Sequence, residues 1–184
     1  MLTSDHGEEF YEHDEWGHGH ALYRELVWVP LVIHRPDGLG ARVTAPLESR
    51  DLYDLVQALA LEPELDLTTW GAARARDVRY ASQYLDRAVD ARADQRWTGL
   101  RRVDGFGGTL IWSAFGPTLE FYDSARDPGE LDNRIDRDGA RADELRAALE
   151  HSVRFWSAPL RVERSARELG FLRALGYAGG VDEP

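Results

Sequence analysis

The chain has 184 residues, which is enough to bury a hydrophobic core and corresponds to one domain or slightly more. Its formal net charge of −11 argues against DNA or RNA as a partner, because both are polyanions. Cysteine is absent, which excludes disulfides, zinc–thiolate sites and a cysteine nucleophile within the chain. All 22 basic residues are arginine, so lysine chemistry is excluded as well.

The first third of the chain predicts a loop, a strand and a helix. The first residues contain no basic segment followed by an apolar stretch, as a signal peptide would have, and the longest apolar run, residues 27–33, is too short to span a membrane. The sequence therefore does not identify the cellular compartment. That run predicts a buried strand, with Pro30 marking an edge or a bulge. Residues 37–40 predict a turn. Ser49 is expected to cap a helix whose apolar positions are Leu52, Leu55, Val56 and Leu59.

The remainder predicts a small antiparallel sheet followed by helices. Residues 62–76 are expected to be mostly loop, and strands are expected at 78–82, 97–103, 109–114 and 119–122. Residues 105–108 and 127–129 are turn sequences. Amphipathic helices are predicted over 142–156 and from about residue 165 to Gly176. The fold class is therefore α/β at the front with an α+β tail.

Histidines and carboxylates gather within the first twenty residues. Four of the six histidines lie there (His6, His13, His18 and His20), together with six acidic residues (Asp5, Glu8, Glu9, Glu12, Asp14 and Glu15). Imidazole and carboxylate are ligands for divalent metals, and adjacent Asp5 and His6 could reach one ion. By composition alone, a solvated polar loop explains the cluster equally well.

The order of residues in this segment resembles that of the sulfatase family of the alkaline-phosphatase superfamily. The resemblance covers residues 3–10 (TSDHGEEF), 12–13 (EH), 16–23 (WGHGHALY) and 29–33 (VPLVI). Further matches follow in family order at residues 120–123 (EFYD), 127–130 (DPGE), Asn133 and 172–177 (LRALGY). The resemblance implies the C-terminal portion of an alkaline-phosphatase-like fold. Residues 1–62 would end the catalytic domain, and residues 63–184 would form a C-terminal subdomain.

The resemblance also implies roles for individual residues. Asp5 and His6 match the ligands of one divalent metal ion, which could be calcium, manganese, magnesium or zinc. His18 or His20 matches the residue that contacts the anion or the leaving group, and we favour His20 because it directly precedes Ala21. His13 fits a loop hydrogen bonder at least as well as a catalytic residue. The five glutamates and aspartates from Glu8 to Glu15 are expected to be capping and solvated charges, and Tyr122 and Asp123 are expected to hold the small sheet together.

The family's nucleophile motif is expected upstream of the segment that begins here. Residues 157–161 (SAPLR) fit that motif literally, but they lie in the wrong order, and we expect no function for them. The resemblance thus implies a hydrolase of sulfate or phosphate esters, on small molecules or glycans. This chain would supply metal ligands and a histidine but not the nucleophile, and its partner could be the missing N-terminal half. The alternative is a non-catalytic remnant or binding module.

Overall fold

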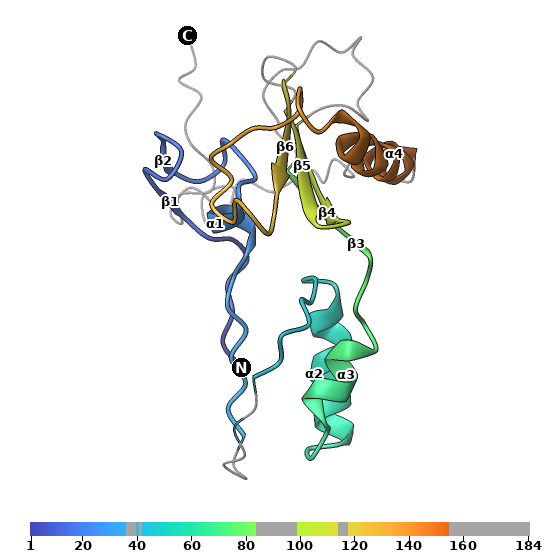
Figure 1. The fold of residues 1–184 in the computed structure, drawn as a ribbon. Coiled ribbons are helices and arrows are strands. Elements are labelled where there is room, and N and C mark those ends of the chain that lie inside the picture. The colour runs from blue at the N-terminus through green and yellow to red at the C-terminus, as the bar shows by residue number, and fades with distance from the viewer. Residues whose placement is uncertain (36–39, 41, 84–98, 114–117, 155–184) are drawn as a thin grey trace, which may run out of the picture.

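The structure is a computed structural model that describes residues 1–35, 40, 42–83, 99–113 and 118–154. Its elements, in chain order, are β1 (Glu9–Phe10), β2 (Trp16–Gly17), α1 (Arg24–Val27), α2 (Asp51–Leu61), α3 (Leu67–Ala72), β3 (Val78–Gln83), β4 (Leu100–Gly105), β5 (Gly108–Ser113), β6 (Thr118–Asp123) and α4 (Gly139–Arg154). The sheet formed by β3 to β6 lies between α4 on one side and β1, β2 and α1 on the other (Figure 1). The predicted α/β class with a small antiparallel sheet is confirmed.

The four-stranded sheet is antiparallel throughout, in the order β3-β4-β5-β6. Its central hairpin turns at Phe106 and Gly107, which have φ of 49° and 72°. Positive φ at both central residues gives a two-residue turn whose twist matches that of the strands, and glycine accepts this conformation without cost. The strands predicted between residues 78 and 122 are therefore confirmed where the structure describes them.

One face of the sheet carries the hydrophobic core. Val103, Leu110 and Phe121 are cross-strand partners in one row, and all three are fully buried. They pack against Leu145 and Leu149 of α4. The apolar stripe of α4, at the helical spacing seen in the sequence, meets the apolar row of the strands on this face.

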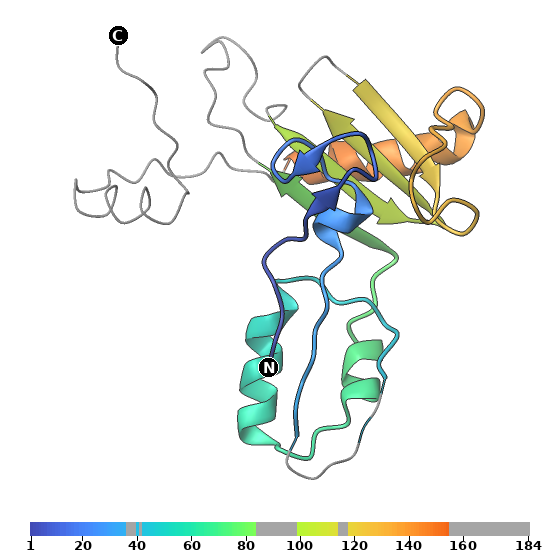
Figure 2. The same ribbon diagram turned by 90° about the vertical axis from the view of Figure 1, so that its left-hand side faces the viewer.

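The opposite face of the same strands is polar and equally buried. Arg102, Asp104, Thr109 and Tyr122 point to this face because they alternate with the core residues along each strand. The Arg102 side chain is only 1% exposed, although an arginine rarely lies buried without paired charges. This polar face lies toward α1 and the β1–β2 hairpin, opposite α4 (Figure 2).

The apolar run at residues 27–33 does not form the predicted buried strand. Residue 27 ends α1, and Val32 alone pairs with Leu2, in an isolated antiparallel bridge with N–O distances of 2.8 Å in both directions. Pro30 has no N–H to donate, so a regular ladder cannot continue through it. The two segments run side by side away from the sheet as a narrow arm (Figures 1 and 2).

Two local predictions are corrected. The helix after Ser49 exists as α2, but Arg50 occupies its N-cap and Ser49 does not cap it; the Asp51 carboxylate instead accepts the N–H of Glu48 at 2.9 Å. Within residues 62–76, the expected loop contains α3. Asp66 starts this helix by accepting the N–H of Thr68 at 3.0 Å, a capping signal that the sequence reading missed.

Several expectations lie outside the described residues. These are most of the turn at 37–40, the motif at 157–161, the final helix from residue 165 and the family ending at 172–177. Over the part of the chain that is described, no helix is both long enough and apolar enough to cross a membrane.

Candidate metal and anion site

The Asp5–His6 pair is held against α1 by the glycine that follows it. The Gly7 N–H donates to the carbonyl of Leu26 at 2.9 Å, which joins the loop to the short helix. A Cβ atom at residue 7 would lie 1.8 Å from the carbonyl oxygen of Glu25. Only glycine allows this approach, so the sequence Asp-His-Gly fixes how closely the two candidate ligands sit on α1.

The donor atoms of Asp5 and His6 suit one divalent ion. His6 Nδ1 donates to the carbonyl of Gly7 at 2.8 Å, so the lone pair is on Nε2, which lies 3.9 Å from Asp5 Oδ1. A backbone carbonyl on the far nitrogen is how proteins commonly orient a metal-binding histidine. The Asp5 side chain is 74% exposed, and a hydrogen bond from its own backbone N–H lowers its pKa, so the carboxylate is ionised near neutral pH. The donor set therefore fits a metal such as calcium, manganese, magnesium or zinc.

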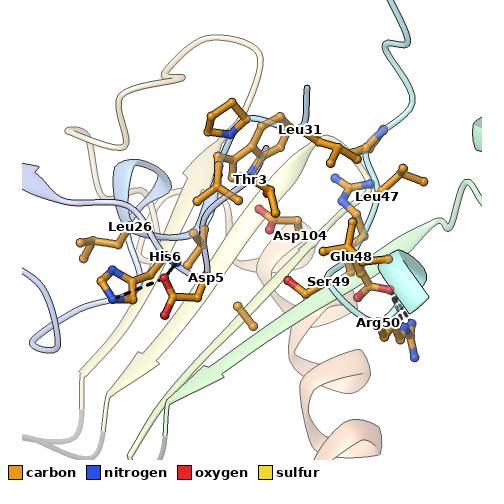
Figure 3. A pocket seen from close by; sticks show the side chains of 18 of the residues that line it. Thr3, Asp5, His6, Leu26, Leu31, Leu47, Glu48, Ser49, Arg50 and Asp104 are labelled. Atoms are coloured by element: carbon orange, nitrogen blue, oxygen red, sulfur yellow. Dashed lines mark hydrogen bonds and ion pairs between the residues drawn. The ribbon is translucent and has the colours of Figure 1, made fainter. Parts of the chain in front are cut away.

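His18 lies beside this pair. Its ring centroid is 4.1 Å from that of His6, and its Nδ1 donates to Glu8 at 3.0 Å, which leaves Nε2 as the other polar atom. Asp5, His6 and His18 all line a groove of about 1410 Å³ between the arm, the segment before α2 and β3. Figure 3 shows Asp5 and His6 on one wall of this groove and Glu48, Ser49 and Arg50 on the other.

His20 is held apart from the groove by a buried carboxylate. Its Nε2 donates to Glu9 Oε2 at 2.6 Å, and the Glu9 side chain is 0% exposed. The other oxygen of Glu9 accepts the backbone N–H groups of His13 and Glu15, at 3.1 and 3.0 Å. Burial raises the pKa of Glu9, but the hydrogen bonds from His20 and the two backbone groups outweigh it, so the pKa is lowered. Glu9 caps the hairpin as predicted, but it is not solvated.

His13 is a hydrogen bonder with no lone pair available. Its Nδ1 donates to the Glu25 carboxylate at 2.7 Å and its Nε2 to the carbonyl of Glu130 at 3.0 Å. Burial lowers the His13 pKa, but these two acceptors outweigh it and raise the pKa. Glu9, His13 and Glu25 place ligand atoms within 4.8 Å of one another, yet a doubly donating imidazolium cannot bind a metal ion. These contacts support the hydrogen-bonding role, which is one of the two roles that the sequence left open for His13.

The C-terminal signature residues brace the sheet. Asp123 accepts the N–H groups of Ala125 and Arg126, both at 3.1 Å, and pairs with Arg141 of α4 at 2.6 Å. Asn133 accepts the N–H of Phe121 at 3.1 Å. The hydrogen bond from Arg141, followed by that from the Arg126 N–H, lowers the pKa of Asp123 to about 2. These contacts support the structural role expected for Asp123.

Tyr122 links the signature to the front of the chain through a shared carboxylate. Its hydroxyl donates to Glu120 Oε2 at 2.9 Å, and the hydroxyl of Tyr23 donates to the same oxygen at 3.1 Å. Burial and the negative charge of Glu120 raise the pKa of Tyr23 to about 12. Tyr23 also stacks on the His13 ring at 3.7 Å, so the tyrosine, the histidine and the sheet form one packed unit.

The sequence reading missed the buried charges beneath the site. Arg102 bonds Asp104 through Nε at 2.9 Å and Nη2 at 2.7 Å, and Glu130 through Nη1 at 2.8 Å and Nη2 at 2.7 Å. Arg102 also donates to the carbonyl of Leu22 at 3.0 Å. Arg102 stands directly before the core residue Val103 and shares its face of β4 with Asp104, and this alternation is the sequence feature that could have pointed to it.

The chain is similar to sulfatases in sequence and in structure. It is 28% identical over 149 residues to an uncharacterized sulfatase, YidJ, of Escherichia coli K12, a match covering 74% of this chain and 28% of that protein. The structure of BT4656 in complex with its substrate D-glucosamine-2-N,6-O-disulfate matches with a TM-score of 0.61 and 20% identity, over 83% of this chain and 33% of that one.

Two further solved structures agree. A putative sulfatase from Bacteroides thetaiotaomicron gives a TM-score of 0.61, and BT1596, a 2-O GAG sulfatase, gives 0.58; both are 20% identical and cover 90% of this chain and 38% of theirs. No protein-family profile matches the chain. The chain spans about 28% of the length of the curated relative and about a third of the solved structures. The resemblance of this chain to the C-terminal portion of a sulfatase is thereby confirmed.

Proposed function

We propose that this chain supplies the C-terminal part of a metal-dependent sulfate ester hydrolase, with Asp5 and His6 as metal ligands. The observation that carries the proposal is the Asp5 carboxylate beside His6 Nε2, at 3.9 Å, on the wall of the groove. Phosphate esters share the tetrahedral anion and remain a second substrate class. The division at residues 62 and 63 belongs to this proposal, with the ligands in the first part and the bracing sheet in the second.

The residues of the groove would bind the anion and move a proton. A divalent ion, when bound, supplies positive charge that polarises the ester oxygens. Asp5 and His6 hold that charge at the groove wall. His18 lies against His6 with one nitrogen engaged by Glu8, so its Nε2 could donate to an ester oxygen or to the leaving group.

The structure gives the two candidate histidines different surroundings. His18 lines the groove, whereas Nε2 of His20 is engaged with buried Glu9, so only Nδ1 of His20 could reach an anion. We therefore place His18 first for anion contact and retain His20 as the second candidate, an order opposite to the one favoured from sequence.

The test is metal binding by the chain, followed by anion binding. Isothermal titration with Mn²⁺ should give one site in the wild type and a loss of at least tenfold in affinity in Asp5→Asn and in His6→Gln. Asp14→Asn is the matched control, because Asp14 lies in the same acidic segment, outside the groove. Equal affinity in all four proteins would refute the site.

The second step asks which histidine meets the anion. With Mn²⁺ saturating, glucosamine 6-sulfate is titrated into His18→Ala and His20→Ala. We expect the larger loss of affinity in His18→Ala. A loss confined to His20→Ala would restore the order that the sequence favoured, and binding of the sulfated sugar without Mn²⁺ would support a non-catalytic binding module instead.

A further inference from the structure

We infer that Glu130 is a positioning residue for the Asp5–His6 metal loop and that it acts on the loop through helix α1. The inference rests on the proposed function, since it assumes that Asp5 and His6 hold the metal. It assigns a site-directed role to a buried residue of the C-terminal signature, 106 positions away from α1 in the sequence.

Glu130 is buried and conformationally constrained, and its side chain bonds to helix α1 rather than to its own segment. Glu130 is 3% exposed, and its backbone has a φ of 56°, a conformation that residues other than glycine seldom adopt. The preceding turn closes with the Glu130 N–H donating to the carbonyl of Asp127 at 3.1 Å. A positive φ at a residue other than glycine is strained, and such strain persists only where the surrounding structure holds the residue in place.

The Glu130 side chain meets the first turn of α1. Oε2 accepts the backbone N–H of Arg24, the first residue of the helix, at 2.9 Å. Tyr23, at the N-cap, makes no side-chain capping bond. A helix of four residues cannot form without outside support, because it contains almost no internal hydrogen bonds. Glu130 therefore supplies the acceptor that the start of α1 lacks.

The end of α1 meets the metal loop. The carbonyl of Leu26 accepts the N–H of Gly7 at 2.9 Å, and the carbonyl of Gly7 accepts from His6 Nδ1 at 2.8 Å. These bonds set the tilt of the His6 ring and thus the direction of Nε2. A continuous chain of contacts runs from Glu130 through α1 to the atom that would bind the metal, and a displacement of α1 would move that atom.

The backbone of Glu130 adds a second attachment. Its carbonyl accepts from Nε2 of His13 at 3.0 Å, and His13 in turn donates to Glu25 within α1. Side chain and carbonyl thus both bear on the same short helix. Arg102, paired with both oxygens of Glu130, fixes the carboxylate in place from the sheet.

If Glu130 had a purely structural role, its function would be to neutralise the buried Arg102 rather than to hold α1. Thr109 separates the two roles, because it belongs to the same buried cluster without any contact to α1 among its hydrogen bonds. Its hydroxyl donates to Asp104 at 2.7 Å and accepts from Arg102 at 3.3 Å. Thr109→Val therefore loosens the cluster from the sheet side and serves as the matched control for Glu130→Gln.

The experiment measures Mn²⁺ affinity of the 184-residue chain by isothermal titration and by electron paramagnetic resonance of the bound ion. We expect Glu130→Gln to bind Mn²⁺ at least about tenfold more weakly than the wild type, the lower end of the loss that follows when the partners of metal ligands are altered. Its amide leaves a single acceptor oxygen for Arg102 and the Arg24 N–H together. Thr109→Val should bind within about twofold of the wild type. Thermal melts of each variant show how much stability was lost.

Glu130→Asp keeps the negative charge for Arg102 but is one methylene shorter, so it cannot also reach the Arg24 N–H. This variant should fold even where Glu130→Gln does not, and it should still lose Mn²⁺ affinity. Wild-type affinity in folded Glu130→Asp would overturn the inference. The inference would also be overturned if Glu130→Gln and Thr109→Val lost Mn²⁺ affinity in proportion to the fall in their melting temperatures. If the wild type binds no Mn²⁺, or binds it unchanged in Asp5→Asn, the proposed function itself fails, and that comparison does not involve Glu130.

Discussion

Replacing Leu145 with alanine tests the packing that holds the sheet from behind. Leu145 is 1% exposed on α4, and it packs in one cluster with Val103, Leu110 and Phe121. Val103 and Leu110 lie in the two central strands, which are hydrogen-bonded on both sides, so the sheet cannot readily close over a cavity. A Leu→Ala change in such a core costs about 2–5 kcal/mol. We expect about 3 kcal/mol in the free energy of unfolding.

Urea denaturation followed by circular dichroism at 222 nm measures this loss, and a thermal melt should fall by roughly 6–12 °C for a chain of this size. Leu61→Ala is the matched control, because Leu61 is also helical but 88% exposed, and it should change the free energy of unfolding by less than about 0.5 kcal/mol. Similar losses in the two variants would refute the reasoning. Mn²⁺ affinity at a pre-melt temperature should be unchanged in Leu145→Ala, because α4 covers the face opposite the site.

Two further predictions concern pH. His13 has a raised pKa in the folded chain, so its contribution to stability is complete below the unfolded value of 6.5 and is lost as the pH rises through the folded value. The difference in melting temperature between wild type and His13→Gln should therefore shrink above that range. A constant difference from pH 5 to 9 would contradict the prediction. Asp123 has a pKa of about 2, so its carboxylate stabilises the fold above pH 3.8 and ceases to do so as the pH falls toward 2. Melts of Asp123→Asn should therefore lie below wild type at pH 7 and converge with it near pH 2, whereas a gap that widens in acid would show that Arg141 is not the partner that matters.

The sequence by itself determined the elements whose signals are local. The hairpin at residues 105–108, the strands on either side of it and the helix through Leu145 and Leu149 follow from alternation, helical spacing and a glycine turn. Within the site, adjacency in the chain already placed Asp5 beside His6, and the glycine after them fixed the close approach to α1.

Tertiary structure decided what depends on partners far apart in the sequence. Residues 27–33 have the composition of a strand, but a strand requires a neighbour that can pair along its length, and within the described chain only Leu2 bonds to Val32. In the sequence His20 differs from His18 only by its place directly before Ala21, and in the structure buried Glu9 engages His20 whereas His18 lines the groove. Arg102 looks like an ordinary surface charge in the sequence, and Glu130 appears there only as the last residue of the match at 127–130. They are buried because the polar face of the sheet is covered by α1 and the hairpin, and a buried charge is tolerated only where the fold brings its counterion.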